Sequence, residues 1–134
     1  MATKTSSYGM ARTVELPYEE AVERTREALG TEGFGVLTEI DVKATLKKKL
    51  GVDFRPYIIL GACNPPLAHQ ALSAGDIGLL LPCNVIVYAN DDGKTSTVSA
   101  IDPVAQLTIA DTEAVEPIAR DVKGRLKSVL DRIQ

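Results

Sequence analysis

The chain of 134 residues contains no tryptophan, and aromatic residues make up only 4% of it. Proteins that bind single-stranded nucleic acids use aromatic side chains to stack the bases, so the composition argues against that class. Histidine occurs once, as His69, and cysteine twice, as Cys63 and Cys83. Soft cysteine ligands would favour zinc or copper, but two are too few for a tetrathiolate zinc site. The sequence therefore predicts no metal site.

An excess of positive charge is also missing. Fifteen basic residues stand against eighteen acidic ones, which gives a net charge of -3 and a pI near 5.2. Because nucleic acids and anionic lipids bind basic surfaces, we expect neither as a partner. The longest apolar stretches, 57–63 and 77–88, are too short or too interrupted to cross a bilayer, and the N-terminus lacks the apolar core of a signal peptide. We expect a soluble, cytoplasmic protein with free thiols.

Hydrophobic residues make up 45% of the chain, enough for one core at this length. The sequence predicts a disordered N-terminal tail over residues 1–7, which are polar, and a single domain over residues 8–134. Alternating apolar positions predict strands over 8–16, 36–41, 57–62, 79–88 and 95–101. Helical spacing predicts helices over 17–30, 42–50, 64–73 and 103–107, and a long final helix with an apolar stripe from Ile118 to Ile133.

Local signals fix several element ends. Asp41 is expected to cap the helix over 42–50, and Pro117 to lie in the first turn of the final helix. Residues 90–93 (Asn-Asp-Asp-Gly) predict a hairpin, so the strands on either side should pair antiparallel. The earlier alternation of strands and helices would also fit parallel crossovers. The sequence alone does not decide whether some of these strands pair in parallel.

The most distinctive motif is a pair of Cys-Asn dipeptides, Cys63-Asn64 and Cys83-Asn84, each of which closes an apolar run. Both can lie on one rim of a sheet, Cys63 at a helix start and Cys83 beside a bend at Pro82. They are candidate residues for thiol chemistry or for binding a small ligand. A catalytic Cys-His pair is disfavoured, because His69 falls on the solvated face of its helix. The alternative is that the cysteines fill the core and the asparagines cap strand and helix ends.

Three charged residues complete the candidate site. Glu39 and Asp41 point the same way on an alternating strand, a spacing compatible with acid-base chemistry. Arg55 precedes the Cys63 strand, and its guanidinium could hold a carboxylate or phosphate. The alternatives are capping by Asp41, a solvated sheet face or an ion pair with Lys43 or Lys47 for Glu39, and an ion pair of Arg55 with Asp53 or Glu39.

Residues 32–42, 54–65 and 78–85 together resemble the family called domain of unknown function 302 (DUF302). The resemblance runs in order from about Val14 to Leu107. It implies an α+β fold in two layers: a curved, mainly antiparallel sheet with helices packed on it, similar to the layout of the TATA-box-binding protein. It also implies a homodimer. DNA binding does not follow, because a fold does not determine function.

No activity or cofactor is assigned to that family, so whether the chain is an enzyme stays open. The resemblance places Cys63, Asn64, Cys83 and Asn84 at recurring positions without naming their role. Two function classes remain. One is a small-ligand-binding or thiol-reactive domain with its site at Cys63 and Cys83. The other is a non-catalytic homodimeric interaction or structural domain.

Overall fold

The computed structural model, which describes residues 3–110 and 113–133, is an α+β fold built on one antiparallel sheet. The sheet has six strands in the order β1-β2-β6-β5-β4-β3, and every neighbouring pair is antiparallel. The strands are β1 (Thr3–Thr5), β2 (Gly9–Val14), β3 (Gly35–Asp41), β4 (Tyr57–Cys63), β5 (Cys83–Ala89) and β6 (Ser96–Ile101). The strand-helix-strand alternation early in the chain therefore does not produce parallel crossovers.

The helices are α1 (Tyr18–Thr31), α2 (Val42–Leu50), α3 (Pro65–Ala71), α4 (Pro103–Leu107) and α5 (Glu116–Arg132). Short 3₁₀ turns cover Ile77–Leu80, Thr108–Ala110 and Glu113–Val115. Asp41 caps α2 by accepting a hydrogen bond from the Ala44 amide at 2.9 Å, as predicted. Among the described residues, no helix is both long and apolar enough to span a membrane.

Two predictions about secondary structure were wrong. The strand expected over 79–88 begins only at Cys83, because residues 77–80 form a 3₁₀ turn. The disordered tail expected over 1–7 instead contributes β1, which pairs with β2 from Thr3 to Thr5. Residues 1–2 lie outside the described residues.

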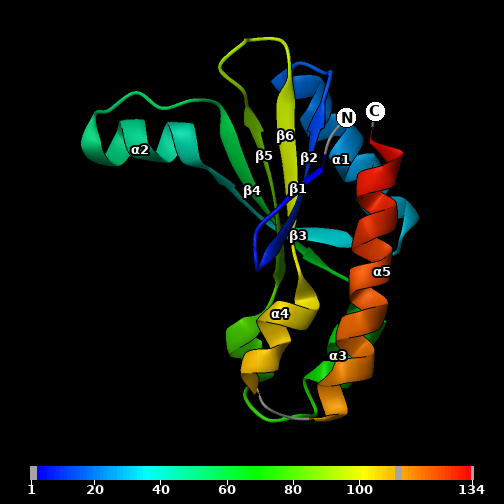
Figure 1. Cartoon of the computed structure of the whole chain (residues 1–134). Coiled ribbons are helices and arrows are strands. Elements are labelled where there is room, and N and C mark those ends of the chain that lie inside the picture. The colour runs from blue at the N-terminus through cyan, green and yellow to red at the C-terminus, as the bar shows by residue number, and fades with distance from the viewer. Residues whose placement is uncertain (1–2, 111–112, 134) are drawn as a thin grey trace.

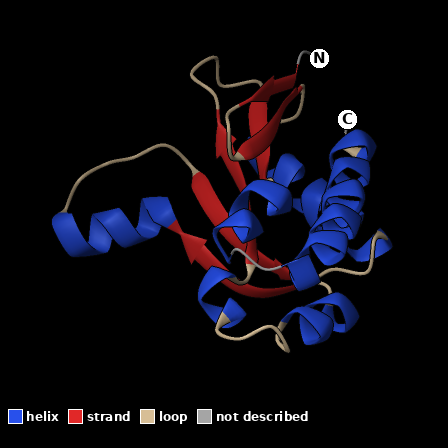
Figure 2. Ribbon diagram, turned by 60° about the horizontal axis from the view of Figure 1, so that its bottom comes forward, coloured by secondary structure: helices blue, strands red, loops and turns tan. Residues whose placement is uncertain are grey.

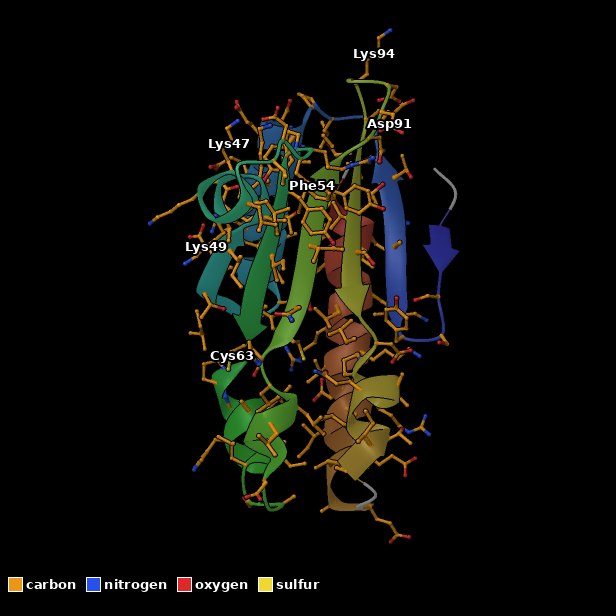
Figure 3. The ribbon with its side chains drawn as sticks, turned by 90° about the vertical axis from the view of Figure 1, so that its left-hand side faces the viewer. Lys47, Lys49, Phe54, Cys63, Asp91 and Lys94 are labelled. Carbon is orange, nitrogen blue, oxygen red and sulfur yellow. The ribbon has the colours of Figure 1, made fainter. Side chains whose placement is uncertain are left out.

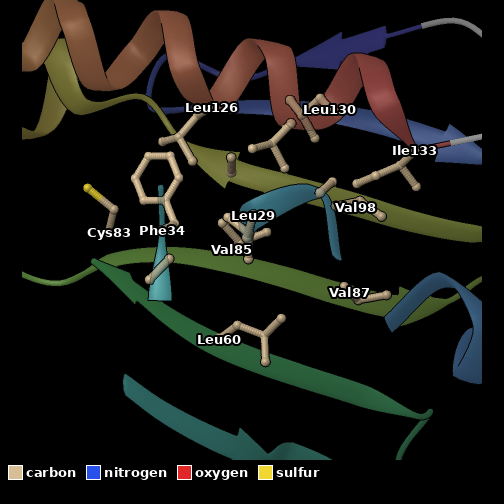
Figure 4. Close-up of a cluster of buried hydrophobic side chains, with 14 of the residues drawn as sticks. Leu29, Phe34, Leu60, Cys83, Val85, Val87, Val98, Leu126, Leu130 and Ile133 are labelled. Atoms are coloured by element: carbon tan, nitrogen blue, oxygen red, sulfur yellow. The ribbon is translucent and has the colours of Figure 1, made fainter. Parts of the chain in front are cut away.

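The core lies between the sheet and the helices α1 and α5, which cover one face of it (Figure 1). Alternate strand residues point into this layer, among them Leu60, Val85 and Val98, which are fully buried. Leu29 from α1 and Leu126 from α5 pack against them (Figure 4). The apolar stripe that predicts the final helix is thus the stripe that faces the sheet.

Helix α2 lies on the other side of the sheet, away from α1 and α5 (Figures 1 and 2). It leaves β3 directly at Val42 and returns to β4 through the loop 51–56. None of its residues is buried. We call the face of the sheet on this side the open face. Its floor consists of the strand residues that alternate with the buried ones, such as Ile59 and Ile86, which are register partners.

Candidate functional site

An apolar cavity of about 350 Å³ lies at the end of the sheet where β4 stops and β5 begins. Its walls come from β3, β4, α3, the segment before β5, α4 and α5. The side chains that line it are aliphatic or aromatic except for Thr38, Asn64 and the two cysteines, and the lining includes no charged residue of the described chain. Leu37 and Leu72 are exposed, 66% and 50%, and form its rim.

Cys83 is the buried thiol of this cavity. Its side chain lies with Phe34 and Leu126 in the core (Figure 4). Burial, and secondarily the charge of Cys63, raise the pKa of the Cys83 thiol from 9.0 to about 11. The thiol donates a weak hydrogen bond to Gln106 Oε1, with Sγ 3.8 Å from the oxygen. Both effects keep the proton on the sulfur, and a protonated thiol is a poor nucleophile.

Cys63 is the more accessible thiol, half-buried at the end of β4. In the register of the sheet, Ala62 is opposite Cys83, so Cys63 is only one residue beyond that pair. Both cysteines therefore lie at the same end of the sheet and line the same cavity. Both are free, with no disulfide between them. Cys63 also precedes the first turn of α3, as predicted.

Asn64 has a structural role at this site. It is 92% buried, and its Oδ1 accepts a hydrogen bond from the Leu67 amide at 3.3 Å, which caps α3. Its Nδ2 donates to the Glu32 carbonyl at 3.5 Å and lies 3.0 Å from the point where a side chain at Gly33 would begin. Gly33 has a φ of +83°, a conformation that glycine adopts without strain. Asn64 therefore caps α3, which is the structural alternative that the sequence suggested for it.

A close approach around Gly61 forms the neighbouring part of the sheet. Gly61 is opposite Thr38 on β3 and opposite Asn84 on β5. A Cβ atom at Gly61 would collide with the Thr38 hydroxyl and lie 2.9 Å from Pro82 Cγ. Only glycine fits here without a shift of its neighbours. Asn84 itself is exposed and does not line the cavity.

None of the three charged candidates lines the cavity. Strand β4 runs from Tyr57 to Cys63, which separates its ends by roughly 20 Å. Arg55 is at the far end, where it donates to Asp91 at 2.9 Å and lies over the Tyr88 ring at 5.8 Å. Figure 3 shows this separation, with Phe54 near the top of the sheet and Cys63 at its lower end. The partners expected for Arg55 from the sequence, Asp53 and Glu39, were wrong.

Glu39 and Asp41, the pair whose spacing suggested acid-base chemistry, are each engaged in another interaction. Both lie on the final part of β3, opposite Leu60 and Ile58. Glu39 forms an ion pair with Arg26 of α1 at 2.5 Å, in place of the lysine partner that the sequence suggested. Asp41 caps α2. The structure thus brings together Cys63, Asn64 and Cys83 and separates them from Glu39, Asp41 and Arg55.

Sequence reasoning missed the residues that fix α4 beside the cavity. Gln106 Nε2 donates to the Leu80 carbonyl at 2.5 Å while its Oε1 faces Cys83. Asp102 caps α4 and binds Lys123 Nζ of α5 at 2.8 Å. Burial raises the pKa of Asp102, but the hydrogen bonds from Lys123 and from backbone amides outweigh it and lower the pKa overall. The Asp-Pro pair at the start of α4 was the available signal for this cap.

Over residues 3–110 and 113–133, no cluster of three or more His, Cys, Asp or Glu side chains could hold a metal ion. His69 is exposed on α3 and is not among the cavity residues. The cavity therefore has the polarity of a site for an uncharged molecule, with one accessible thiol at its wall.

The comparisons with known proteins agree with this architecture. The family described as "Domain of unknown function DUF302" matches residues 10–133. An uncharacterised conserved DUF302 protein from Bacillus stearothermophilus, known from a crystal structure, is 33% identical to the chain with a TM-score of 0.87. The similarity covers 96% of this chain and all of that one. A search of curated proteins found no relative. The chain belongs to the DUF302 family.

Proposed function

We propose that the chain is a binding protein for a small, uncharged and mainly apolar molecule, held in the cavity beside Cys63 and Cys83. The observation that carries this proposal is the composition of the cavity wall, which is apolar and has no charged side chain. Its volume of about 350 Å³ is at the lower end of the range of roughly 300 to 1,000 Å³ found for ligand sites. An ionic ligand would lose its hydration without gaining a partner.

Binding is better supported than thiol catalysis. Cys83 keeps its proton because its pKa is raised to about 11. Cys63 has no charged or imidazole group beside it in the described cavity wall that would act as its base. The thiol of Cys63 instead offers a polarisable contact to the ligand at the cavity wall.

Titration with N-phenyl-1-naphthylamine, a neutral apolar dye that fluoresces in dry sites, tests this proposal. We expect saturable binding of one dye per chain. Ala68→Phe should abolish it, because Ala68 lies on the cavity wall and the larger ring fills the space. The matched control is Ala44→Phe on α2, an exposed site away from the cavity, which should leave the affinity unchanged.

Two outcomes would reject the cavity as a binding site: no saturable binding to the wild type, or equal affinity for the wild type and Ala68→Phe. Native mass spectrometry of the purified protein adds an independent measurement. A mass increment that is absent from Ala68→Phe would identify the size of a natural ligand.

We also propose a second function class, self-association into a homodimer. The specific observation in its favour is that α2 has no buried residue and leaves Leu50 68% exposed. A helix of nine residues is too short to be stable on its own in water, where roughly 12 to 15 residues are needed. Within the chain, α2 is held by its two caps and by Lys43 and Lys47, which bind the loop 51–56, so a partner would add the cover that the Leu50 side chain lacks.

A further inference from the structure

The charge of the chain is unevenly distributed. Residues 42–56, which comprise α2 and the loop that returns to β4, contain five basic residues and one acidic residue, a net charge of +4. The other residues contain ten basic and seventeen acidic ones, a net charge of -7. We call residues 42–56 the basic arm. The overall charge of -3, which argued against an anionic partner, therefore conceals a strongly positive segment.

The basic arm protrudes from the body of the molecule. Helix α2 leaves β3 at Val42, and its C-terminal end at Leu50 points away from the sheet (Figures 1 and 2). A helix of nine residues is about 13 Å long. Its last turn contains Lys47, Lys48 and Lys49, and none of its residues is buried. The positive charge is thus concentrated at the end that lies farthest from the sheet.

Contacts within the arm leave most of this charge uncompensated. Lys43 donates to a backbone carbonyl of the loop at 2.8 Å, which has no net charge. Lys47 forms an ion pair with Asp53 at 3.2 Å, but both side chains are exposed and such pairs stabilise little. Over the described residues, Lys48 and Lys49 form no hydrogen bond or ion pair. Three of the four lysines of α2 therefore have no acidic partner within the described chain.

Exposed apolar side chains lie beside these lysines. Leu50, Val52 and Phe54 are 68%, 45% and 40% exposed. They follow the last turn of α2 and the loop after it, so they occupy the same end of the arm as the free lysines. Figure 3 views the molecule from this side and labels Lys49 and Phe54. Lysines next to exposed apolar side chains on a short helix are typical of segments that lie at a membrane surface.

We propose that the basic arm binds the surface of an anionic lipid bilayer, with Leu50 and Val52 inserted between the headgroups and Lys48 and Lys49 against the lipid phosphates. This proposal is independent of the cavity and of the molecule bound there. Each lysine near an anionic surface is attracted to it. Burial of the apolar side chains among the lipids adds to this attraction.

The shape of the arm favours a membrane over an acidic peptide. A protruding end can meet a flat surface, whereas a peptide needs a groove to hold its side chains. The hollow of about 300 Å³ between α2 and the loop is not such a groove for an acidic chain, because Asp41 and Asp53 lie in its wall beside the lysines. Phosphate contacts with a nucleic acid would use the lysines alone and leave the apolar side chains in water.

The acidic remainder of the chain does not prevent this contact. Helix α1 carries four glutamates and two arginines, and it lies on the other face of the sheet from α2 (Figure 1). At physiological ionic strength, charges more than about 8 Å apart are largely screened from each other. The arm is longer than this distance, so a surface at its end is affected mainly by the lysines. The opposed charges also orient the molecule, with the arm toward an anionic surface.

The test is co-sedimentation of the full chain with lipid vesicles. The wild type should bind vesicles of phosphatidylglycerol and phosphatidylcholine, less tightly as salt is added, and should not bind phosphatidylcholine alone. The double variant Lys48→Gln, Lys49→Gln should bind roughly 30-fold more weakly. The matched control is Arg120→Gln with Lys127→Gln on α5, which changes the net charge equally on the opposite face and should leave the affinity unchanged.

A second variant tests insertion of the apolar side chains. Leu50→Ser should weaken binding to the anionic vesicles at least about fivefold, because less apolar surface enters the bilayer. Leu50 is exposed, so the variant should keep its circular dichroism spectrum. The matched control is Leu79→Ser, a leucine 85% exposed outside the arm, which should bind as the wild type does.

Several results would overturn the proposal. They are no binding to anionic vesicles, equal binding to both kinds of vesicle, and an unchanged affinity of either arm variant. Tighter binding of polyglutamate or of DNA, at equal concentration of negative charge, would assign the arm to a different partner. Sedimentation without vesicles tests a second copy of the chain as the cover of Leu50. A dimer that Leu50→Ser dissociates would support self-association and overturn the insertion of Leu50 into lipid.

Discussion

Replacement of Cys83 by alanine should change stability in opposite directions at neutral and at alkaline pH. At pH 7 the thiol is protonated in both the folded and the unfolded chain, so Cys83→Ala only removes a buried sulfur. We expect a loss of about 1 kcal/mol, similar to the deletion of one buried methyl group. The pKa of Cys83 is 9.0 when unfolded and about 11 when folded, because burial disfavours the thiolate.

The direction in which the free energy of unfolding changes at high pH follows from these two pKa values. Below pH 9 the thiol is protonated in both states, and its full contribution to the free energy of unfolding is present. Between pH 9 and 11 the unfolded chain loses the thiol proton while the folded chain keeps it, so the free energy of unfolding falls. Two pH units correspond to about 2–3 kcal/mol. The wild type should lose this amount and Cys83→Ala should not. The variant should therefore be the more stable protein near pH 11, by about 1–2 kcal/mol.

The assay is urea unfolding followed by circular dichroism for both proteins, from pH 7 to 11. Other groups that titrate in this range are common to the two proteins, so the difference in the free energy of unfolding isolates Cys83. A difference that stays constant across the range would refute the reasoning. It would mean that the sulfur is solvated in the folded chain or that its environment stabilises the thiolate.

Three further changes test the packing around the sheet. Gly61→Ala should destabilise the fold by about 1–3 kcal/mol because its methyl group meets the Thr38 hydroxyl, and adding Thr38→Ala should restore part of the loss in thermal unfolding. Asp102→Ala should cost about 1–3 kcal/mol at pH 7. Because the pKa of Asp102 is lowered, this difference should shrink as the pH falls through the carboxyl range, measured by urea unfolding. Leu126→Ala should cost about 2–5 kcal/mol and Leu79→Ala less than about 0.5 kcal/mol, since only Leu126 is buried.

Local chemistry made much of the fold predictable. The bounds of α2 follow from the Asp41 cap and from Gly51, which ends the helix with a φ of +69°. The short helix α4 and the antiparallel pairing of β5 with β6 were also confirmed. These features depend on interactions between residues that are close in the sequence, such as caps and turns. Such interactions can be recognised from the residue types alone.

The features that failed depend on contacts between distant residues. Leu79 and Leu80 look like strand residues, but they form a 3₁₀ turn, because a strand needs a paired neighbour and the ladder with β4 starts only at Cys83. Arg55 binds Asp91, 36 residues later, because the sheet places the two loops side by side. The cavity could not be predicted from the sequence for the same reason, since six separate segments contribute residues to its wall.

The irregular edge strand β3 has a consequence for how the protein can assemble. The pairing of β3 with β4 shifts register between Val36 and Thr38, and the strand runs directly into α2 at Val42. Irregular, charged and blocked edges discourage the addition of a foreign strand, and Glu39 and Asp41 add charge there. The β3 edge of the sheet is therefore protected against sideways pairing with a strand of another molecule, which is the first step of ribbon-like aggregation.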